Sequence, residues 1–84
     1  MFGLIIYSRP GCHLCDEMKE LVRKVSRTIP LSLKEIDIST DPELEAAYGL
    51  EIPVLLVNGK KAAKYRIGEE ELRKLLAGRT GRAG

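Results

Sequence analysis

The chain has 84 residues, of which 44% are hydrophobic and 31% are charged, a composition typical of a globular protein with one small core. Its formal net charge of +2 is too small to favour nucleic acid or an anionic membrane as a partner. No apolar run reaches the roughly 20 residues of a membrane-spanning helix, and the first residues lack the basic leader of a secretory signal.

The first predicted elements are a buried strand and a helix. Phe2 to Ser8 is a continuous apolar run, typical of a strand covered on both faces, and Pro10-Gly11 breaks it. Apolar residues then recur at helical spacing, at Leu14, Met18, Leu21, Val22 and Val25. We expect this helix to end near Thr28, ahead of Pro30.

The rest of the chain predicts three strands and two helices. Residues 31–38, LSLKEIDI, alternate in one phase and then in the other, which predicts a strand and suggests a bulge. Residues 41–49 have the cap, first-turn proline and final glycine of a short helix. Residues 53–57 and 60–66 should be strands joined by a tight turn at Asn58-Gly59. A last helix begins at Gly68.

This order of elements predicts an α/β fold with a mixed sheet. The first two strands should be parallel, joined by a right-handed crossover, and the last two should form an antiparallel hairpin. We expect one domain over residues 1–77. Residues 78–84, GRTGRAG, have no apolar anchor and are expected to form a flexible tail.

Two cysteines three positions apart stand where the first strand meets the first helix. Cys15 continues the apolar stripe of the helix, so we expect its sulfur to be shielded. Cys12 lies at the helix start, where free N–H groups and the helix dipole stabilise a thiolate, and Arg9 and a protonated His13 would add to this. Cys12 could then attack a substrate disulfide, and Cys15 could resolve the mixed disulfide.

Other uses of this Cys-x-x-Cys pair fit less well. A structural disulfide across four residues would constrain little of the unfolded chain. A zinc site wants about four ligands, and His13 cannot easily join the same coordination sphere as its neighbour Cys12. A carrier of copper, or of an iron–sulfur cluster shared between two chains, needs only two thiolates from this chain and stays the alternative. Copper carriers with this motif end in a strand, whereas this chain is expected to end in a helix.

Three stretches carry a family likeness: YSRPGCHLC at 7–15, EIDISTDPEL at 35–44 and EIPVLLVNGK at 51–60. Together they resemble the glutaredoxin branch of the thioredoxin-fold superfamily, in particular small bacterial glutaredoxin-like proteins with a CHLC motif. The similarity covers most of residues 3–77. It implies a thioredoxin fold, whose four strands, numbered along the chain, lie in the order 2-1-3-4.

The resemblance also implies a dithiol–disulfide oxidoreductase and assigns roles within it. Cys12 would be the nucleophile, Cys15 the resolving thiol, and His13 a residue that tunes their redox potential. The peptide bond before Pro53 would be cis and would lie beside the active cysteine. Ile52, just before it, would offer its backbone to an extended substrate or to glutathione.

The resemblance further implies where glutathione would bind. Arg9 would meet its glycyl carboxylate. In RIGEEEL, at 66–72, Ile67 replaces a glycine of the family, and Glu69 brings negative charge to the place of the γ-glutamyl carboxylate. We therefore expect glutathione to be a poor co-substrate, and a reductase or thioredoxin-like protein to be the better electron donor.

The remaining expectations concern location and partners. Without a visible signal peptide we expect a cytoplasmic protein, in a compartment that keeps thiols reduced. We expect a monomer that acts on protein disulfides, with no resident cofactor and with neither nucleic acid nor membrane as a partner.

Overall fold

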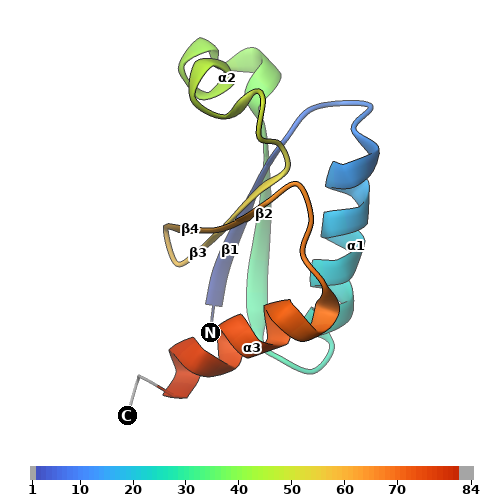
Figure 1. Ribbon diagram of the computed structural model, residues 1–84, viewed down its shortest axis with the longest axis vertical. Helices are drawn as coiled ribbons and strands as arrows, with labels where there is room; N and C mark the ends of the chain where they lie inside the picture. The colour runs from blue at the N-terminus through green and yellow to red at the C-terminus, as the bar shows by residue number, and fades with distance from the viewer. Residues whose placement is uncertain (1, 82–84) are drawn as a thin grey trace.

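The computed structural model describes the backbone of residues 2–81 and the side chains of residues 2–77. Its elements, in chain order, are β1 (Phe2–Ser8), α1 (His13–Ser26), β2 (Leu31–Asp37), a short 3-10 helix η1 (Ile38–Thr40), α2 (Pro42–Tyr48), β3 (Val54–Val57), β4 (Lys60–Lys64) and α3 (Glu69–Gly81) (Figure 1). The strands form one sheet in the order β2-β1-β3-β4, with β1 parallel to β2 and antiparallel to β3. This confirms the predicted mixed sheet and its strand order.

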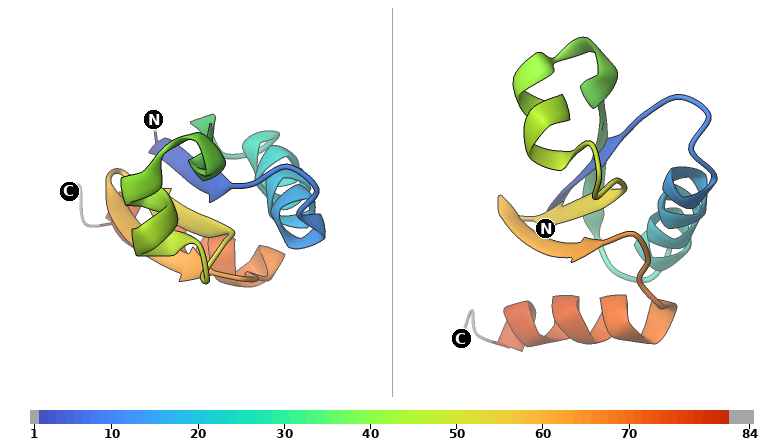
Figure 2. Two further views of the ribbon diagram at one scale, coloured as in Figure 1. Left: turned by 90° about the horizontal axis from the view of Figure 1, so that it is seen from above. Right: turned by 45° about the horizontal axis from the view of Figure 1, so that its top comes forward.

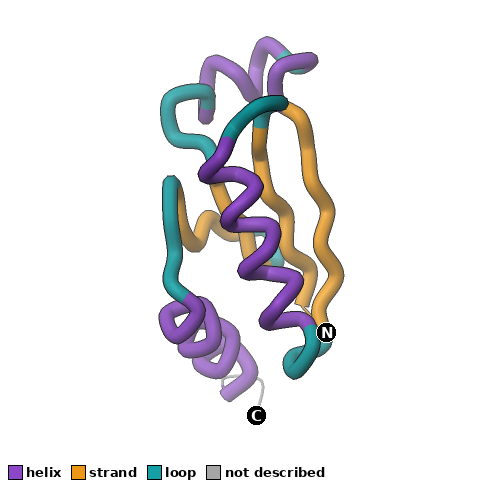
Figure 3. The backbone as a smooth tube through the Cα atoms, turned by 90° about the vertical axis from the view of Figure 1, so that its right-hand side faces the viewer, coloured by secondary structure: helices purple, strands orange, loops and turns teal. Residues whose placement is uncertain are grey.

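One face of the sheet is covered by α1 and α3, and the main core lies beneath them (Figure 3). The predicted stripe of α1 is confirmed, since its buried residues are Cys15, Met18, Val22 and Val25. The core also contains Leu4 and Ile6 of β1, Leu55 and Val57 of β3, and Leu72 and Leu76 of α3. Because β1 is central and buried, the loop that follows it is held in place at the end of the sheet where β1 finishes.

The helix α2 lies apart from the other two, beyond the end of the sheet where β1 and β2 finish (Figure 2). Asp41 caps it by accepting hydrogen bonds from the N–H groups of Glu43 and Leu44, as its sequence predicted. The Tyr48 ring lies 4.8 Å from the Tyr7 ring, centroid to centroid, so this side chain of α2 packs on the second face at the end of β1.

The suggested bulge in residues 31–38 is wrong, because β2 pairs with β1 in continuous register from Leu31 to Asp37. The change of phase has another cause. Leu33 packs against the main core, whereas Ile36 pairs with Tyr7, which points to the face where Tyr48 packs. The irregular pairing of the sheet lies instead between β3 and β4, next to Leu55 and Leu56.

The hairpin is confirmed at Asn58-Gly59, where both residues have the positive φ that a tight two-residue turn requires. The returning strand ends at Lys64 rather than at the predicted residue 66. Tyr65 has a φ of 66°, which breaks the strand, and its N–H donates to the Pro53 carbonyl at 2.9 Å. The segment after β4 is therefore held beside the segment that leads into β3.

At the C-terminal end, α3 continues to Gly81, so the backbone of residues 78–81 is helical where the sequence predicted the start of a tail. Residues 82–84, the rest of the predicted tail, lie outside the described residues. None of the helices within residues 2–81 has both the length and the apolar character needed to cross a lipid bilayer.

Candidate active site

The cysteine pair sits at the junction of β1 and α1, and its two sulfurs have different surroundings. Cys12 is the N-cap of α1, and its Sγ accepts a hydrogen bond from the Cys15 N–H at 3.2 Å. The sulfur thus occupies the place of a capping oxygen, among the free N–H groups of the first turn. Both cysteines are free thiols; Cys12 is half-buried, whereas Cys15 is 1% exposed.

The environment of Cys15 keeps it protonated. The pKa of the Cys15 thiol is raised to about 12, first by burial and then by a side-chain hydrogen bond to Cys12. The charges of Cys12 and Asp16 act in the same direction, while a backbone hydrogen bond at Arg9 opposes them. Cys15 is therefore a neutral thiol at physiological pH in the reduced protein.

The predicted residues 52 and 53 reach the same end of the sheet. The Ile52–Pro53 bond is cis, which is the geometry that the EIPV motif implied. Because Tyr7 pairs with Val54, the antiparallel register brings the buried Pro53 to the end of β1, just ahead of the cysteine loop. Ile52 is half-buried, and its contact with a substrate stays a prediction.

The His13 side chain is exposed at the first position of α1. It makes no hydrogen bond or ion pair within the described residues, so nothing holds the imidazole against Cys12. Its predicted role in setting the redox potential stays a prediction.

Arg9 is tied to α2 by contacts that the sequence did not predict. Its guanidinium forms an ion pair with Glu45 and donates to the Gly49 carbonyl at 3.1 Å. A Cβ on Gly49 would lie 2.5 Å from the Glu45 carbonyl oxygen and 3.0 Å from the Arg9 Nη2, so these groups leave no room for a side chain. The predicted contact between Arg9 and a glutathione carboxylate stays a prediction, and any such carboxylate has to compete with Glu45.

A chain of polar groups lies on the β2 side of the cysteine loop. The buried Ser8 Oγ donates to Glu35 at 2.7 Å, Lys19 pairs with Glu35 at 2.9 Å, and Lys19 also pairs with Asp16 at 3.3 Å. The Ser8 hydroxyl, followed by Lys19, lowers the pKa of Glu35, and Glu35 in turn raises the pKa of Lys19. These four residues, with Arg9, Pro10, Gly11 and Asp37, line a cavity of about 300 Å³.

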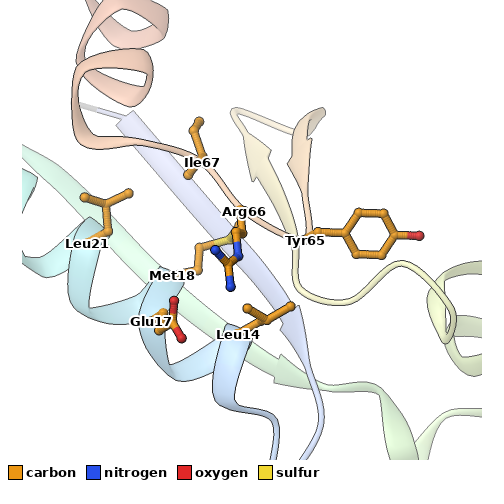
Figure 4. Close-up of a pocket in the computed structure, with 7 residues that line it drawn as sticks. All are labelled: Leu14, Glu17, Met18, Leu21, Tyr65, Arg66 and Ile67. Carbon is orange, nitrogen blue, oxygen red and sulfur yellow. The ribbon is translucent and has the colours of Figure 1, made fainter.

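An apolar groove of about 250 Å³ lies on the opposite side of the loop, between α1 and the segment that follows β4. Figure 4 shows the side chains that line it: Leu14, Glu17, Met18, Leu21, Tyr65, Arg66 and Ile67. Leu14 is one of the two residues between the cysteines. The groove therefore begins directly beside the pair.

Glu69 faces away from the cysteine loop. Its carboxylate pairs with Lys24, in the last turn of α1, at 3.0 Å and with Arg73 at 3.0 Å, and these two cations lower its pKa. Glu69 thus links α3 to the far end of α1, and Lys24 and Arg73 balance its negative charge. Its predicted place at the γ-glutamyl carboxylate stays a prediction.

Comparison with known proteins places this arrangement in a family. The sequence profile of the glutaredoxin-like domain (DUF836) matches residues 3–77. The chain belongs to this glutaredoxin-like family. Its curated relatives include the uncharacterized proteins Rv0508 of Mycobacterium tuberculosis and Mb0520 of Mycobacterium bovis, each 26% identical over 73 residues, which cover 81% of this chain and 75% of the relative.

Solved structures share the fold of this glutaredoxin-like domain. The protein Ne2328 from Nitrosomonas europaea is similar with a TM-score of 0.77 at 28% identity, covering 88% of this chain and 89% of that one. The protein XcR50 from X. campestris reaches 0.76 at 33% identity, covering 89% and 96%. A mutant thioredoxin from Halobacterium salinarum reaches 0.59 at 22% identity, covering 88% and 70%, and shows a shared fold alone. The predicted thioredoxin fold is thereby confirmed.

The alternative use of the cysteines in this glutaredoxin-like domain is metal binding. Within the part of the chain that the structure describes, no group of three or more His, Cys, Asp or Glu side chains could hold a metal ion. A carrier that uses two thiolates needs fewer ligands than this, so it stays the alternative.

The sequence analysis did not predict two sets of contacts near the cysteine pair: the hydrogen bond of Ser8 to Glu35 and the ion pair of Arg9 with Glu45. Ser8 did carry a signal, because it is a polar residue at a core-facing position of an otherwise apolar strand. The Arg9–Glu45 pair joins residues that are 36 positions apart, and nothing in a single sequence of a glutaredoxin-like domain shows that they meet.

Proposed function

We propose that this glutaredoxin-like domain is a thiol–disulfide oxidoreductase that reduces disulfides of protein substrates. The observation that carries the proposal is the unequal placing of two neighbouring free thiols. One is half-buried and caps a helix, so that its sulfur accepts a hydrogen bond from the first turn, and the other is buried and protonated. This is the arrangement that a two-step thiol exchange needs.

In the first step, the Cys12 thiolate attacks one sulfur of the substrate disulfide. A bond forms between Cys12 and that sulfur, and the other substrate sulfur leaves as a thiolate, which takes a proton from water. In the second step, Cys15 gives up its proton, by way of water, to the second substrate sulfur and attacks the Cys12 sulfur. The Cys12–Cys15 disulfide forms, and the second substrate sulfur leaves, so two electrons have passed to the substrate.

The pKa of Cys15 supports this order of attack. Two of its causes, the hydrogen bond and the charge, come from Cys12. Once Cys12 is bonded to the substrate its sulfur is uncharged, so the charge effect disappears and the pKa of Cys15 falls. Burial, the largest cause, remains, so the pKa of Cys15 stays raised in the mixed disulfide but by less than in the reduced protein.

The oxidised pair must then be reduced, and we propose a protein dithiol as the main electron donor, in the cytoplasm. Arg9, which would bind glutathione, is already paired with Glu45. Ile67, which the resemblance to glutaredoxins places at a glycine position, lines the groove beside the pair. Both features support weak use of glutathione.

The test is to incubate the reduced protein with insulin, to alkylate the free thiols, and to follow by mass spectrometry the thiols that appear on insulin while those of Cys12 and Cys15 are lost. Cys15→Ser should accumulate a mixed disulfide through Cys12, visible by mass spectrometry, because the resolving step is missing. Cys12→Ser should show no turnover. A Cys12→Ser protein that reduced insulin at the rate of the unmodified protein would contradict the proposal.

A further inference from the structure

The apolar groove beside the cysteine pair has features that the proposed exchange reaction does not use. Its apolar walls come from two segments, Leu14, Met18 and Leu21 on α1 and Ile67 after β4 (Figure 4). Tyr65, at the start of the second segment, is hydrogen bonded to Pro53 through its backbone. The groove therefore runs from the residues between the cysteines along the flank of α1.

The rim of the groove carries charges that have no partner. Among residues 2–77, the side chains of Arg66 and Glu17 form no hydrogen bond or ion pair, and both line the groove. In the view of Figure 4 the Arg66 guanidinium lies between Met18 and Leu14, on the Leu14 side of the groove. Arg9, by contrast, is bound to Glu45. Of these two arginines, Arg66 is the one that can bind an incoming anion without first breaking an ion pair.

The size of the groove favours part of a polypeptide over a whole small molecule. Its volume of about 250 Å³ is below the roughly 300–1,000 Å³ of pockets that enclose a ligand. The apolar surface also continues past it, because Tyr65 is 45% exposed and its hydroxyl donates to the carbonyl of Leu50, which is 93% exposed. A bound polypeptide can cover both the groove and these two side chains.

We propose that this groove selects the protein substrates of the domain. An extended segment next to the substrate cysteine places a bulky apolar side chain between Leu14 and Ile67 and an acidic side chain against Arg66. This inference rests on the proposed oxidoreductase function and adds the class of substrate. The apolar contact removes hydrophobic surface from water, and the charge contact favours acidic over basic sequences near the disulfide.

The test compares four disulfide-bonded peptides that differ only at two positions near the cysteine. One position is Leu or Ser, and the next is Glu or Lys. We expect kcat/KM to be about tenfold higher with Leu than with Ser, because the side chain is partly buried in the groove. We expect kcat/KM to be about fivefold higher with Glu than with Lys, because the Glu side chain forms one exposed ion pair with Arg66.

Two matched variants then test whether Arg66 causes the preference for the Glu peptides. Arg66→Glu should reverse the ratio between the Glu and Lys peptides. Arg27→Glu makes the same charge change at an exposed site after the far end of α1 and should leave the ratio as it was. The ratio is used because it cancels any effect on the chemical step.

The outcomes separate the two proposals. If the four peptides are reduced at one rate, or if both variants change the ratio equally, the groove does not select substrates, although the oxidoreductase function stands. If neither insulin nor any peptide is reduced, the function itself fails, and the inference fails with it.

Discussion

The two sides of the loop between β1 and α1 are built in opposite ways. On the α2 side, Arg9 is bound to Glu45, and Gly49 has no room for even a methyl group. On the side of the segment after β4, Arg66 has no partner among the described residues, and a Cβ on Gly68 would meet nothing within 4 Å. A basic residue near a reactive thiol is therefore not enough to indicate a binding site, because its availability depends on what surrounds it.

The difference in packing gives the largest expected effect. Gly49→Ala should lower the free energy of unfolding by about 1–3 kcal/mol, because the added methyl group overlaps the Glu45 carbonyl and pushes on Arg9. Gly68→Ala, the matched change on the open side, should stay within about 0.5 kcal/mol. Urea denaturation of both variants measures the comparison. Equal losses of unfolding free energy at the two positions would show that the two sides of the loop are packed equally closely.

The electrostatic part of the comparison is tested by releasing Arg9. Glu45→Gln removes the carboxylate that competes with an incoming anion. Because both side chains of the pair are 38% exposed, the pair is worth at most about 1 kcal/mol, so turnover with glutathione should rise by up to about fivefold. Steady-state assays with glutathione as the electron donor check this.

The control for this variant removes a similar carboxylate elsewhere. Glu20→Gln breaks an exposed ion pair with Arg23 on α1 and should leave glutathione turnover unchanged. If Glu45→Gln behaves like Glu20→Gln, Arg9 has no role in binding glutathione even when it is free.

Much of the fold was predictable because it depends on local patterns. The stripe from Leu14 to Val25 predicted α1 and the burial of Cys15, and the Asn58-Gly59 pair predicted the hairpin. These signals are local because helix periodicity and turn conformation are properties of a few consecutive residues. The strand order and the cis bond at Pro53 came from the family resemblance instead.

What could not be predicted depends on contacts between distant segments. The phase change in β2 looked like a bulge because the sequence does not show that Tyr48 of α2 packs on Tyr7, the residue that pairs with Ile36. The ion pair of Arg9 could not be predicted for the same reason, since its partner Glu45 lies on another element. The groove needs α1 and the segment around Ile67 to be placed together before its shape exists.

The smallest expected effect concerns the polar groups on the β2 side of the cysteine loop. Their contacts should make the stability of the protein depend on pH in the acid range. The pKa of Glu35 is lowered, first by the Ser8 hydroxyl and then by Lys19, so folding favours its ionised form. The stabilisation is therefore complete above the ordinary glutamate pKa of about 4.3 and is lost as the pH falls through the lower value of the folded protein.

Glu35→Gln removes this contribution while keeping an oxygen that can accept from Ser8. Its side chain is 42% exposed, so at pH 7 the variant should be less stable by under about 1 kcal/mol. At pH values well below 4 the difference should vanish, because the protonated carboxyl of the parent is also neutral. Urea unfolding at both pH values measures this, and a stability difference that does not change with pH would show that the Ser8–Glu35–Lys19 contacts do not depend on the charge of Glu35.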